Sequence, residues 1–124
     1  MRNLAPGLVR QRVVVEAIPR EFILPLRIRE YLQGLAEVTN MEVLSGPHIY
    51  PALDMGCGAG YGSWTHWKTS GSTFYSYRAF PPQLPHPLIT LDCYTCKPFD
   101  PQAVLRYTKE FFDPVDLDWI EVTH

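Results

Sequence analysis

The chain has 124 residues, of which 46% are hydrophobic and 19% charged, and its formal net charge is −2. This length allows one core of two layers, so we expect a single domain over residues 1–124. The weak negative charge and the lack of lysine or arginine runs argue against nucleic acid and anionic membranes as partners.

The apolar stretches and the cysteines predict the compartment in which the protein works. The apolar stretches are far shorter than the roughly 20 residues of a membrane-spanning helix. The N-terminus also lacks the continuous apolar core of a signal peptide, so we expect a cytoplasmic protein. Three cysteines are an odd number, which favours reduced thiols over a disulfide framework.

Segments rich in β-branched residues and helical patterns that follow a proline divide the chain into short elements. Pro25 and Pro101 each suit the first turn of a helix, and Asp100 is a natural N-cap for the second one. In chain order we expect a loose N-terminal arm (1–9), a strand (12–18), a helix (25–39), a short strand (41–44), a glycine-rich loop (46–62), two strands (64–67 and 73–80), a proline-rich link (81–87), a strand (88–94), a helix (101–112) and a last strand (117–122).

This order of elements predicts the fold class. Strands that follow one another closely form antiparallel pairs, and helices that are few in number cover one side of the sheet. We therefore expect an α+β fold, a two-layer sandwich of a mostly antiparallel sheet with two helices on one face. A sheet of this kind exposes an edge and a face, so we also expect a homodimer.

A glycine-rich stretch, residues 53–62, is similar to the first motif of class I methyltransferases, in which glycines let the backbone approach S-adenosylmethionine. That motif joins a strand to a helix in a doubly wound sheet. Here Pro47 and Pro51 interrupt the segment where the strand should run, and the aromatic segment 61–67 has little helical drive. We expect a glycine-rich loop and keep a methyltransferase-like S-adenosylmethionine binder as the less favoured alternative.

A serine and a cysteine form the more informative pattern. Thr69-Ser70-Gly71 is a turn of small residues that opens a strand. Asp92-Cys93-Tyr94-Thr95-Cys96 ends the next strand, just before the capped helix. A serine at a turn and a cysteine at a strand end are the two groups that a self-processing pyruvoyl enzyme needs.

Together with the order of elements over 10–122, this pattern resembles the prokaryotic S-adenosylmethionine decarboxylase family. That family has a Glu-Ser-His turn, a strand with a second histidine and then a tryptophan, and a strand ending in Asp-x-Phe-Thr-Cys. The resemblance implies that Ser70 attacks the carbonyl of Thr69, that the chain breaks between them, and that a pyruvoyl group remains at residue 70. It further implies a pyruvoyl-dependent decarboxylase of S-adenosylmethionine or a related amino compound, serving polyamine (spermidine) biosynthesis.

The same resemblance implies roles for other side chains. Cys96 matches the family's proton donor, which returns a proton to the substrate carbon after carbon dioxide leaves. Tyr75 stands where the family has its later histidine, and Tyr77 where it has the tryptophan. Trp64, Trp67 and Tyr77, with Tyr75, are expected to supply a stacking surface for the adenine of a small-molecule substrate.

The chain departs from the family at the residues that run processing. Thr69 replaces the glutamate before the serine, Gly71 replaces the histidine after it, and Tyr75 replaces the histidine that assists self-cleavage. A tyrosine hydroxyl is a poor base at neutral pH, and His66 can substitute only if the hairpin brings it to Ser70. These departures leave a second function open, namely a homologue that stays intact and acts as a binding or regulatory subunit.

The spacing Cys93-x-x-Cys96 also fits half of a zinc site or a redox pair. A zinc site needs two further ligands, and with Cys57 as the only other cysteine it requires a scattered histidine. Side chains three positions apart on a strand point to opposite faces, which disfavours both chelation and a disulfide. We therefore expect no metal site, and Cys93 as a small buried apolar side chain.

Overall fold

The computed structural model describes residues 1–52 and 58–123. Over these residues the chain forms six strands and two helices, in the order β1 (Gln11–Ile18), α1 (Pro25–Val38), β2 (Val43–Ala52), β3 (Gly60–Trp67), β4 (Ser70–Tyr77), β5 (Leu88–Thr95), α2 (Pro101–Phe112) and β6 (Asp116–Thr123). The strands make one sheet in the order β2-β3-β4-β5-β1-β6, and each neighbouring pair is antiparallel.

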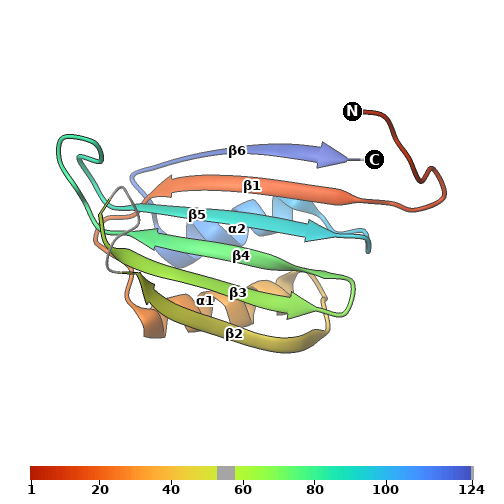
Figure 1. Cartoon of the computed structure of the whole chain (residues 1–124), viewed down its shortest axis with the longest axis horizontal. Helices are drawn as coiled ribbons and strands as arrows, with labels where there is room; N and C mark the ends of the chain where they lie inside the picture. The colour runs from red at the N-terminus through yellow and green to blue at the C-terminus, as the bar shows by residue number, and fades with distance from the viewer. Residues whose placement is uncertain (53–57, 124) are drawn as a thin grey trace.

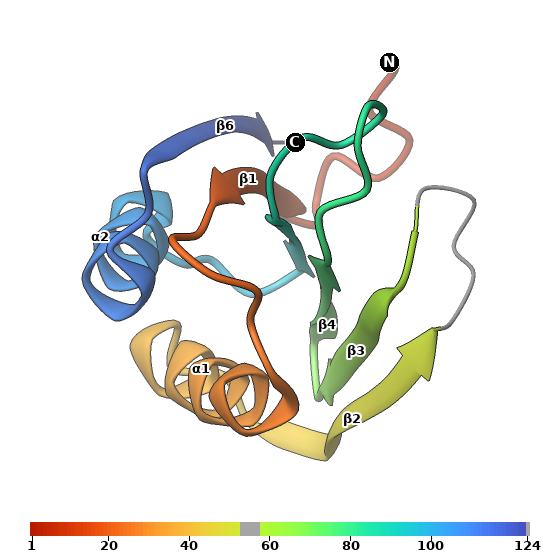
Figure 2. The same ribbon diagram turned by 90° about the vertical axis from the view of Figure 1, so that its left-hand side faces the viewer.

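Both helices lie on the same side of the sheet, while its other side has no helix over it (Figures 1 and 2). This arrangement confirms the predicted α+β sandwich of an antiparallel sheet with two helices on one face. Neither helix of the described part of the chain is long and apolar enough to cross a membrane.

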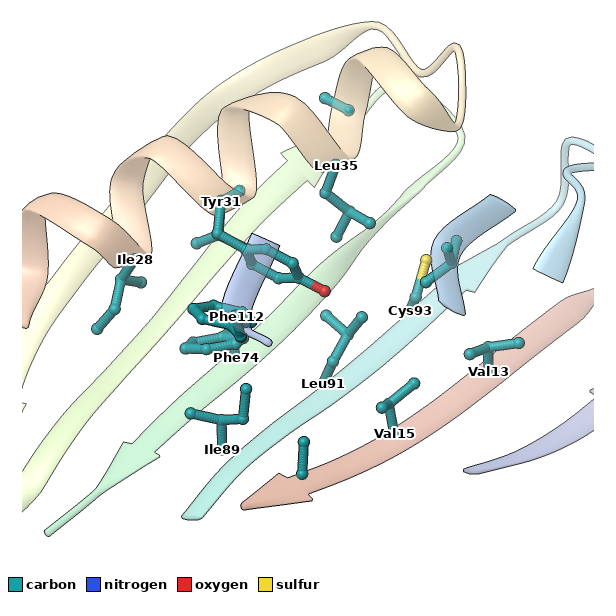
Figure 3. Close-up of a cluster of buried hydrophobic side chains, with 14 of the residues drawn as sticks. Val13, Val15, Ile28, Tyr31, Leu35, Phe74, Ile89, Leu91, Cys93 and Phe112 are labelled. Carbon is teal, nitrogen blue, oxygen red and sulfur yellow. The ribbon is translucent and has the colours of Figure 1, made fainter. Parts of the chain in front are cut away.

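The core lies between the helices and the sheet, because alternate strand residues point toward the helices. On β1 and β5 these are apolar, and Figure 3 shows Val13, Val15 and Leu91 facing Tyr31 and Leu35 of α1. Tyr31 is fully buried, and its hydroxyl lies 2.7 Å from that of Thr108 on α2. Burying one such large side chain stabilises the fold by roughly 1.5–3 kcal/mol, so this layer of contacts holds the helices to the sheet.

The two helices begin and end as the sequence predicts. Each has a proline in its first turn, where the missing N–H has no helical partner in any case. The carboxylate of Asp100 accepts a hydrogen bond from the Gln102 N–H at 3.0 Å and so caps α2. Asp113 ends α2 in a left-handed conformation with φ of 44°.

The predictions for residues 41–62 are wrong over most of their length. A short strand was expected over 41–44. The strand found there, β2, starts at Val43 and continues through Pro47 and Pro51 to Ala52. Because β2 is an edge strand, a proline there removes no ladder hydrogen bond that the sheet needs, and register shifts near Ser45 absorb the irregularity. The expected loop over 46–62 is therefore strand at 46–52 and at 60–62.

The methyltransferase-like motif is placed between two antiparallel strands. Residues 53–57 lie outside the described residues, but β2 precedes them and β3 follows them, paired to β2 as a neighbour. The sheet is antiparallel, and a strand takes the place of the helix that the motif needs. This arrangement does not provide the strand–loop–helix context of a methyltransferase.

The serine turn is also displaced relative to the prediction. The turn between β3 and β4 consists of Lys68 and Thr69, while Ser70 and Gly71 are the first two residues of β4. Ser70 pairs with Trp67 across the hairpin. A two-residue hairpin connection between paired strands leaves no room for the three-residue turn expected at 69–71.

Candidate functional site

The sheet register brings Ser70 and Cys96 together although they lie far apart in the chain. Ser70 begins β4 and pairs with Thr95, the last residue of β5. Cys96 follows directly, so it lies beside the hairpin turn that Lys68 and Thr69 form. A hydroxyl and a thiol thus meet at one end of two neighbouring strands in the middle of the sheet.

Two donors of Cys96 converge on one carbonyl oxygen. The backbone N–H of Cys96 donates to the oxygen of Thr69 at 3.3 Å, and the thiol Sγ donates to the same oxygen at 3.1 Å. This oxygen belongs to the peptide bond between Thr69 and Ser70. Two donors aimed at one carbonyl oxygen form the arrangement that stabilises negative charge on it when the carbonyl carbon is attacked.

Side-chain hydrogen bonds hold the turn in this position. The hydroxyl of Thr69 lies 3.1 Å from that of Thr95, which is fully buried. The Thr95 hydroxyl also accepts a hydrogen bond from the backbone N–H of Lys97 at 3.0 Å, and Met41 places its sulfur against both threonines. Thr95 and Met41 therefore fix the position of the Thr69–Ser70 bond against the segment that carries Cys96.

The hydroxyl of Ser70 is buried and has no hydrogen-bond partner among the described residues. The same holds for three neighbouring groups on the helix-facing side of β3 and β4, namely the hydroxyls of Thr65 and Ser72 and the indole N–H of Trp67. A buried polar group without a partner is costly and rare in a folded protein. The Ser70 hydroxyl is therefore not held by a hydrogen bond to another described residue.

Of the other predicted site residues, Trp64 borders the hollow beside the Thr69–Ser70 bond, and the rest lie elsewhere on the sheet. Trp67 is fully buried among the core residues. Trp64, Tyr75 and Tyr77 alternate with the core-facing residues of β3 and β4 and so lie on the opposite side, which we call the open face. Tyr75 is five positions from Ser70, about 17 Å along the strand, so the two do not meet within one chain.

His66 belongs to the open face as well. It precedes the buried Trp67 on β3 and is exposed, whereas Ser70 pairs with Trp67 on the helix-facing side. The hairpin consequently does not bring the imidazole of His66 to the hydroxyl of Ser70. Within the described residues, the structure unites Thr69, Ser70 and Cys96 and leaves the predicted aromatic residues outside this cluster.

A hollow of about 720 Å³ lies on the open face next to the Thr69–Ser70 bond. Gly71 lies in this hollow and has no side chain to fill it. The ion pair of Arg12 with Asp92 forms one wall, with Nε–Oδ1 at 2.9 Å and Nη2–Oδ2 at 2.5 Å. The hydrogen bond to Asp92 raises the pKa of Arg12, so this wall carries a charged guanidinium whose charge the partner carboxylate offsets. Thr69 and Ser70 border the hollow, which makes it the candidate ligand pocket.

The other cysteine of the motif, Cys93, belongs to the hydrophobic core. Cys93 is completely buried, and this burial raises the pKa of its thiol to about 12. Its side chain lies in the core with those of Leu91 and Val13 (Figure 3). Among the described residues, no group of three or more potential metal ligands is found.

Sequence reasoning missed two contacts of the site. Thr95 was within the strand-end motif, but its hydrogen bond to Thr69 depends on the register of β4 against β5. Arg12 and Asp92 meet from strands that are distant in the chain, and nothing in either local segment indicates the pair. Only the identity of the strand neighbours, set by the whole sheet, reveals these contacts.

Comparisons with known proteins give one informative result. No protein-family model matches the chain, and no curated protein sequence matches it. Among solved structures, the chain is similar to the adenosylmethionine decarboxylase from Aquifex aeolicus VF5, with a TM-score of 0.69. The sequences are 19% identical, and the match covers 93% of this chain and 89% of that one. The chain therefore has the fold of an S-adenosylmethionine decarboxylase.

Proposed function

We propose that the protein is a pyruvoyl-dependent decarboxylase that activates itself by cleavage before Ser70. The observation that carries this proposal is the pair of hydrogen bonds from Cys96 to the carbonyl oxygen of Thr69. The free hydroxyl of Ser70 is the nucleophile next to that carbonyl. The shared fold with an adenosylmethionine decarboxylase supports S-adenosylmethionine or a related amino compound as the substrate, and polyamine synthesis as the process served.

In the proposed cleavage, Ser70 Oγ loses its proton and bonds to the carbonyl carbon of Thr69. The negative charge then develops on the oxygen that Cys96 contacts. The C–N bond breaks, the serine nitrogen takes up the proton, and an ester joins Thr69 to Ser70. Loss of the Ser70 Cα proton expels the Thr69 carboxylate, after which water replaces the nitrogen as ammonia and leaves the pyruvoyl group.

The chain's own residues also determine the chemistry of the cleaved protein. A pyruvoyl group at residue 70 supplies a carbonyl that bonds a substrate amine and accepts the electrons released with carbon dioxide. Cys96 holds a proton on Sγ beside the cleaved bond, from which it can be given to the product carbon. Arg12 borders the adjacent hollow as an ion pair with Asp92, and its guanidinium is the group there that can donate hydrogen bonds to an anionic group of the substrate.

A second candidate function is an intact binding or regulatory subunit of the same fold. One observation favours it. The Ser70 hydroxyl has no hydrogen-bond partner within the described residues, and both Tyr75 and His66 belong to the other side of the sheet of the same chain. A serine whose proton has no acceptor reacts slowly, because general-base assistance contributes about 10²–10⁴-fold.

Intact-mass measurement of the purified protein separates the two candidates. Cleavage converts the 14.2 kDa chain into fragments of residues 1–69 and 70–124, the second of which reacts with hydrazine through its new carbonyl. Ser70→Ala should remain one species. Ser72→Ala, which removes another buried hydroxyl without a partner two positions along β4, should still be cleaved.

A wild-type chain that stays whole after long incubation and carries no hydrazine-reactive carbonyl rules out the decarboxylase. The intact-subunit candidate then stands, and calorimetric titration with S-adenosylmethionine tests it. Binding that is lost in Arg12→Ala and kept in Arg29→Ala, an exposed arginine on α1, would support the hollow as the binding site.

A further inference from the structure

Four buried polar side chains, which we call the polar quartet, lie next to one another on the helix-facing side of β3 and β4. Thr65 and Trp67 belong to β3, while Ser70 and Ser72 belong to β4. The register pairs Trp67 with Ser70 and Thr65 with Ser72. The hydroxyl and indole N–H groups of the quartet are buried and have no hydrogen-bond partner among the described residues. Such groups are rare in a folded interior, so four adjacent ones require a common explanation.

The spacing of the polar quartet suits a molecule as small as water. Paired side chains of two strands have Cβ atoms about 4.5–5.5 Å apart, and side chains two positions apart on one strand lie roughly 7 Å apart. A water that hydrogen-bonds to two groups at about 2.8 Å links polar atoms about 5.5 Å apart. The indole N–H donates to such a water, and each hydroxyl can donate or accept. A buried water makes about three hydrogen bonds, so the quartet supplies a full set of partners.

A cavity of about 600 Å³ connects the surface with one member of the quartet. It lies between α1 and the β2 end of the sheet, where Figure 1 shows α1 behind β2 and β3. Its lining includes the exposed Gln33, Glu37 and Asn40 and the buried Met41 and Thr65. Polar side chains therefore stand both at the outside of the cavity and at its inner end, which makes it a path for water.

We propose that the polar quartet binds the water that converts residue 70 into a carbonyl, and that the cavity beneath α1 supplies this water. The inference rests on the proposed self-cleavage. Elimination leaves residue 70 as an enamine, which becomes an imine when a proton passes from its nitrogen to Cβ. The oxygen of water then bonds to Cα and the C–N bond breaks. Both protons of the water leave with the nitrogen as ammonia, and the oxygen remains as the carbonyl oxygen.

The position of the quartet brings the water to the carbon that must be hydrolysed. One of its corners is the Ser70 side chain, so a water held there lies beside the Cα of that residue. The Ser70 oxygen leaves with Thr69 during elimination, whereas Thr65, Trp67 and Ser72 stay in place and keep the water. These three are positioning residues. The water reaches residue 70 from the helix-facing side, so it does not compete with a ligand in the hollow on the open face.

Thr65→Val tests the proposal, because it removes a hydroxyl and keeps the shape of the side chain. Mass spectrometry measures cleavage as the appearance of fragment 70–124. Quenching with borohydride measures carbonyl formation separately, since it reduces an imine at residue 70 to an alanyl group and a carbonyl to a lactyl group.

We expect Thr65→Val to be cleaved at the wild-type rate and to form the carbonyl about tenfold more slowly, because the bound water loses a hydrogen-bond partner. Trp67→Phe, which removes the indole N–H, should behave in the same way. Ser63→Ala is the matched control on the same side of β3. Its hydroxyl donates to the carbonyl oxygen of Phe74 at 2.8 Å and lies outside the quartet, so both steps should keep their wild-type rates.

A measurement on the uncleaved chain tests water binding by itself. In isotopically labelled Ser70→Ala, the indole proton of Trp67 should show a nuclear Overhauser effect to a water of long residence time, and adding Thr65→Val should weaken it. An indole proton without such a water overturns the binding site, whether or not the wild type is cleaved. Carbonyl formation in Thr65→Val as fast as in the wild type overturns the hydrolytic role, while the proposed cleavage stands. A wild-type chain that stays whole overturns the proposed function, and the hydrolytic role with it.

Discussion

Cys93 and Cys96 lie three positions apart and have opposite surroundings. Cys93 is enclosed by the core, where burial keeps its thiol protonated. Cys96 lies beyond the end of β5, is only partly buried, and contacts the Thr69 carbonyl. The two thiols therefore contribute to different properties, one to stability and the other to the chemistry of the cleaved bond.

We expect Cys96→Ala to slow cleavage by roughly 100-fold, because it removes one of two donors from the developing negative charge. Its free energy of unfolding should change little. Cys93→Ala should lower that free energy by about 1 kcal/mol or more through the cavity it leaves, while cleavage continues. Intact-mass time courses and urea denaturation measure both effects, and similar behaviour of the two variants would refute the distinction.

The close approach of β3 and β4 at Gly71 requires a residue without a side chain. A Cβ at this position would lie 2.6 Å from the backbone carbonyl oxygen of Thr65 on the paired strand, closer than real contacts allow. Gly71→Ala must push β3 and β4 apart, and we expect a loss of about 1–3 kcal/mol in the free energy of unfolding. Gly7→Ala is the matched control, because its added methyl meets no atom within 4 Å. Equal stability of the two variants would contradict this explanation.

Among the elements, α2 depends on a single side-chain cap. Asp100→Ala removes the acceptor for the Gln102 N–H and should cost about 1 kcal/mol in the free energy of unfolding. Asp100→Asn keeps an oxygen in the same place and should cost much less. Thermal or urea unfolding compares the two. If Asp100→Asn lowered the free energy of unfolding as much as Asp100→Ala does, then the charge of Asp100, rather than its hydrogen bond, would stabilise the start of the helix.

Elements with strong local signals were predicted from the sequence, while those that depend on their neighbours were not. The first strand has a run of β-branched residues, each helix has a proline in its first turn, and α2 has a capping aspartate. These local features match the structure. β2 was misjudged because Pro47 and Pro51 argue against a strand unless it lies at an edge. The edge position of β2 results from the order of the whole sheet.

In the candidate site, too, some features have a local signal in the sequence and others depend on the neighbouring strands. Ser70, Thr69 and Cys96 could be selected from the sequence because a turn and a strand end have local patterns. The side of the sheet on which each residue lies depends on where β4 begins. Since the turn is Lys68–Thr69, Ser70 belongs to the strand and faces the helices, opposite Tyr75. A shift of one residue in a turn reverses the faces of all later residues in the strand.

For the molecule as a whole, the buried core predicts sensitivity to alkali. Burial raises the pKa of Cys93 to about 12 and that of Tyr107 to about 12, and it also raises the pKa of Tyr31. In the unfolded chain these groups lose their protons near pH 9–10, whereas the folded chain keeps them. Unfolding therefore releases protons above about pH 9, and stability falls as the pH rises.

Below about pH 8 these groups should leave the free energy of unfolding unchanged. Between pH 9 and 12 we expect it to decline by up to about 1.4 kcal/mol per pH unit for each of Cys93 and Tyr31, and by less for the half-buried Tyr107, because water screens its charged form. Urea denaturation at pH 7, 9, 10 and 11 measures it. Cys93→Ala should reduce the slope between pH 9 and 10 without removing it, because the tyrosines remain. A free energy of unfolding that stays constant to pH 11 would contradict the prediction.

The strand order has a consequence for a chain broken between Thr69 and Ser70. Residues 1–69 contain β1, β2 and β3, while residues 70–124 contain β4, β5 and β6. In the sheet, β3 lies against β4, and β1 lies between β5 and β6. The two pieces are interleaved, so they cannot separate without opening three ladders of hydrogen bonds. Two peptides with these sequences, made separately and mixed, should reassemble into the same sheet as a split protein.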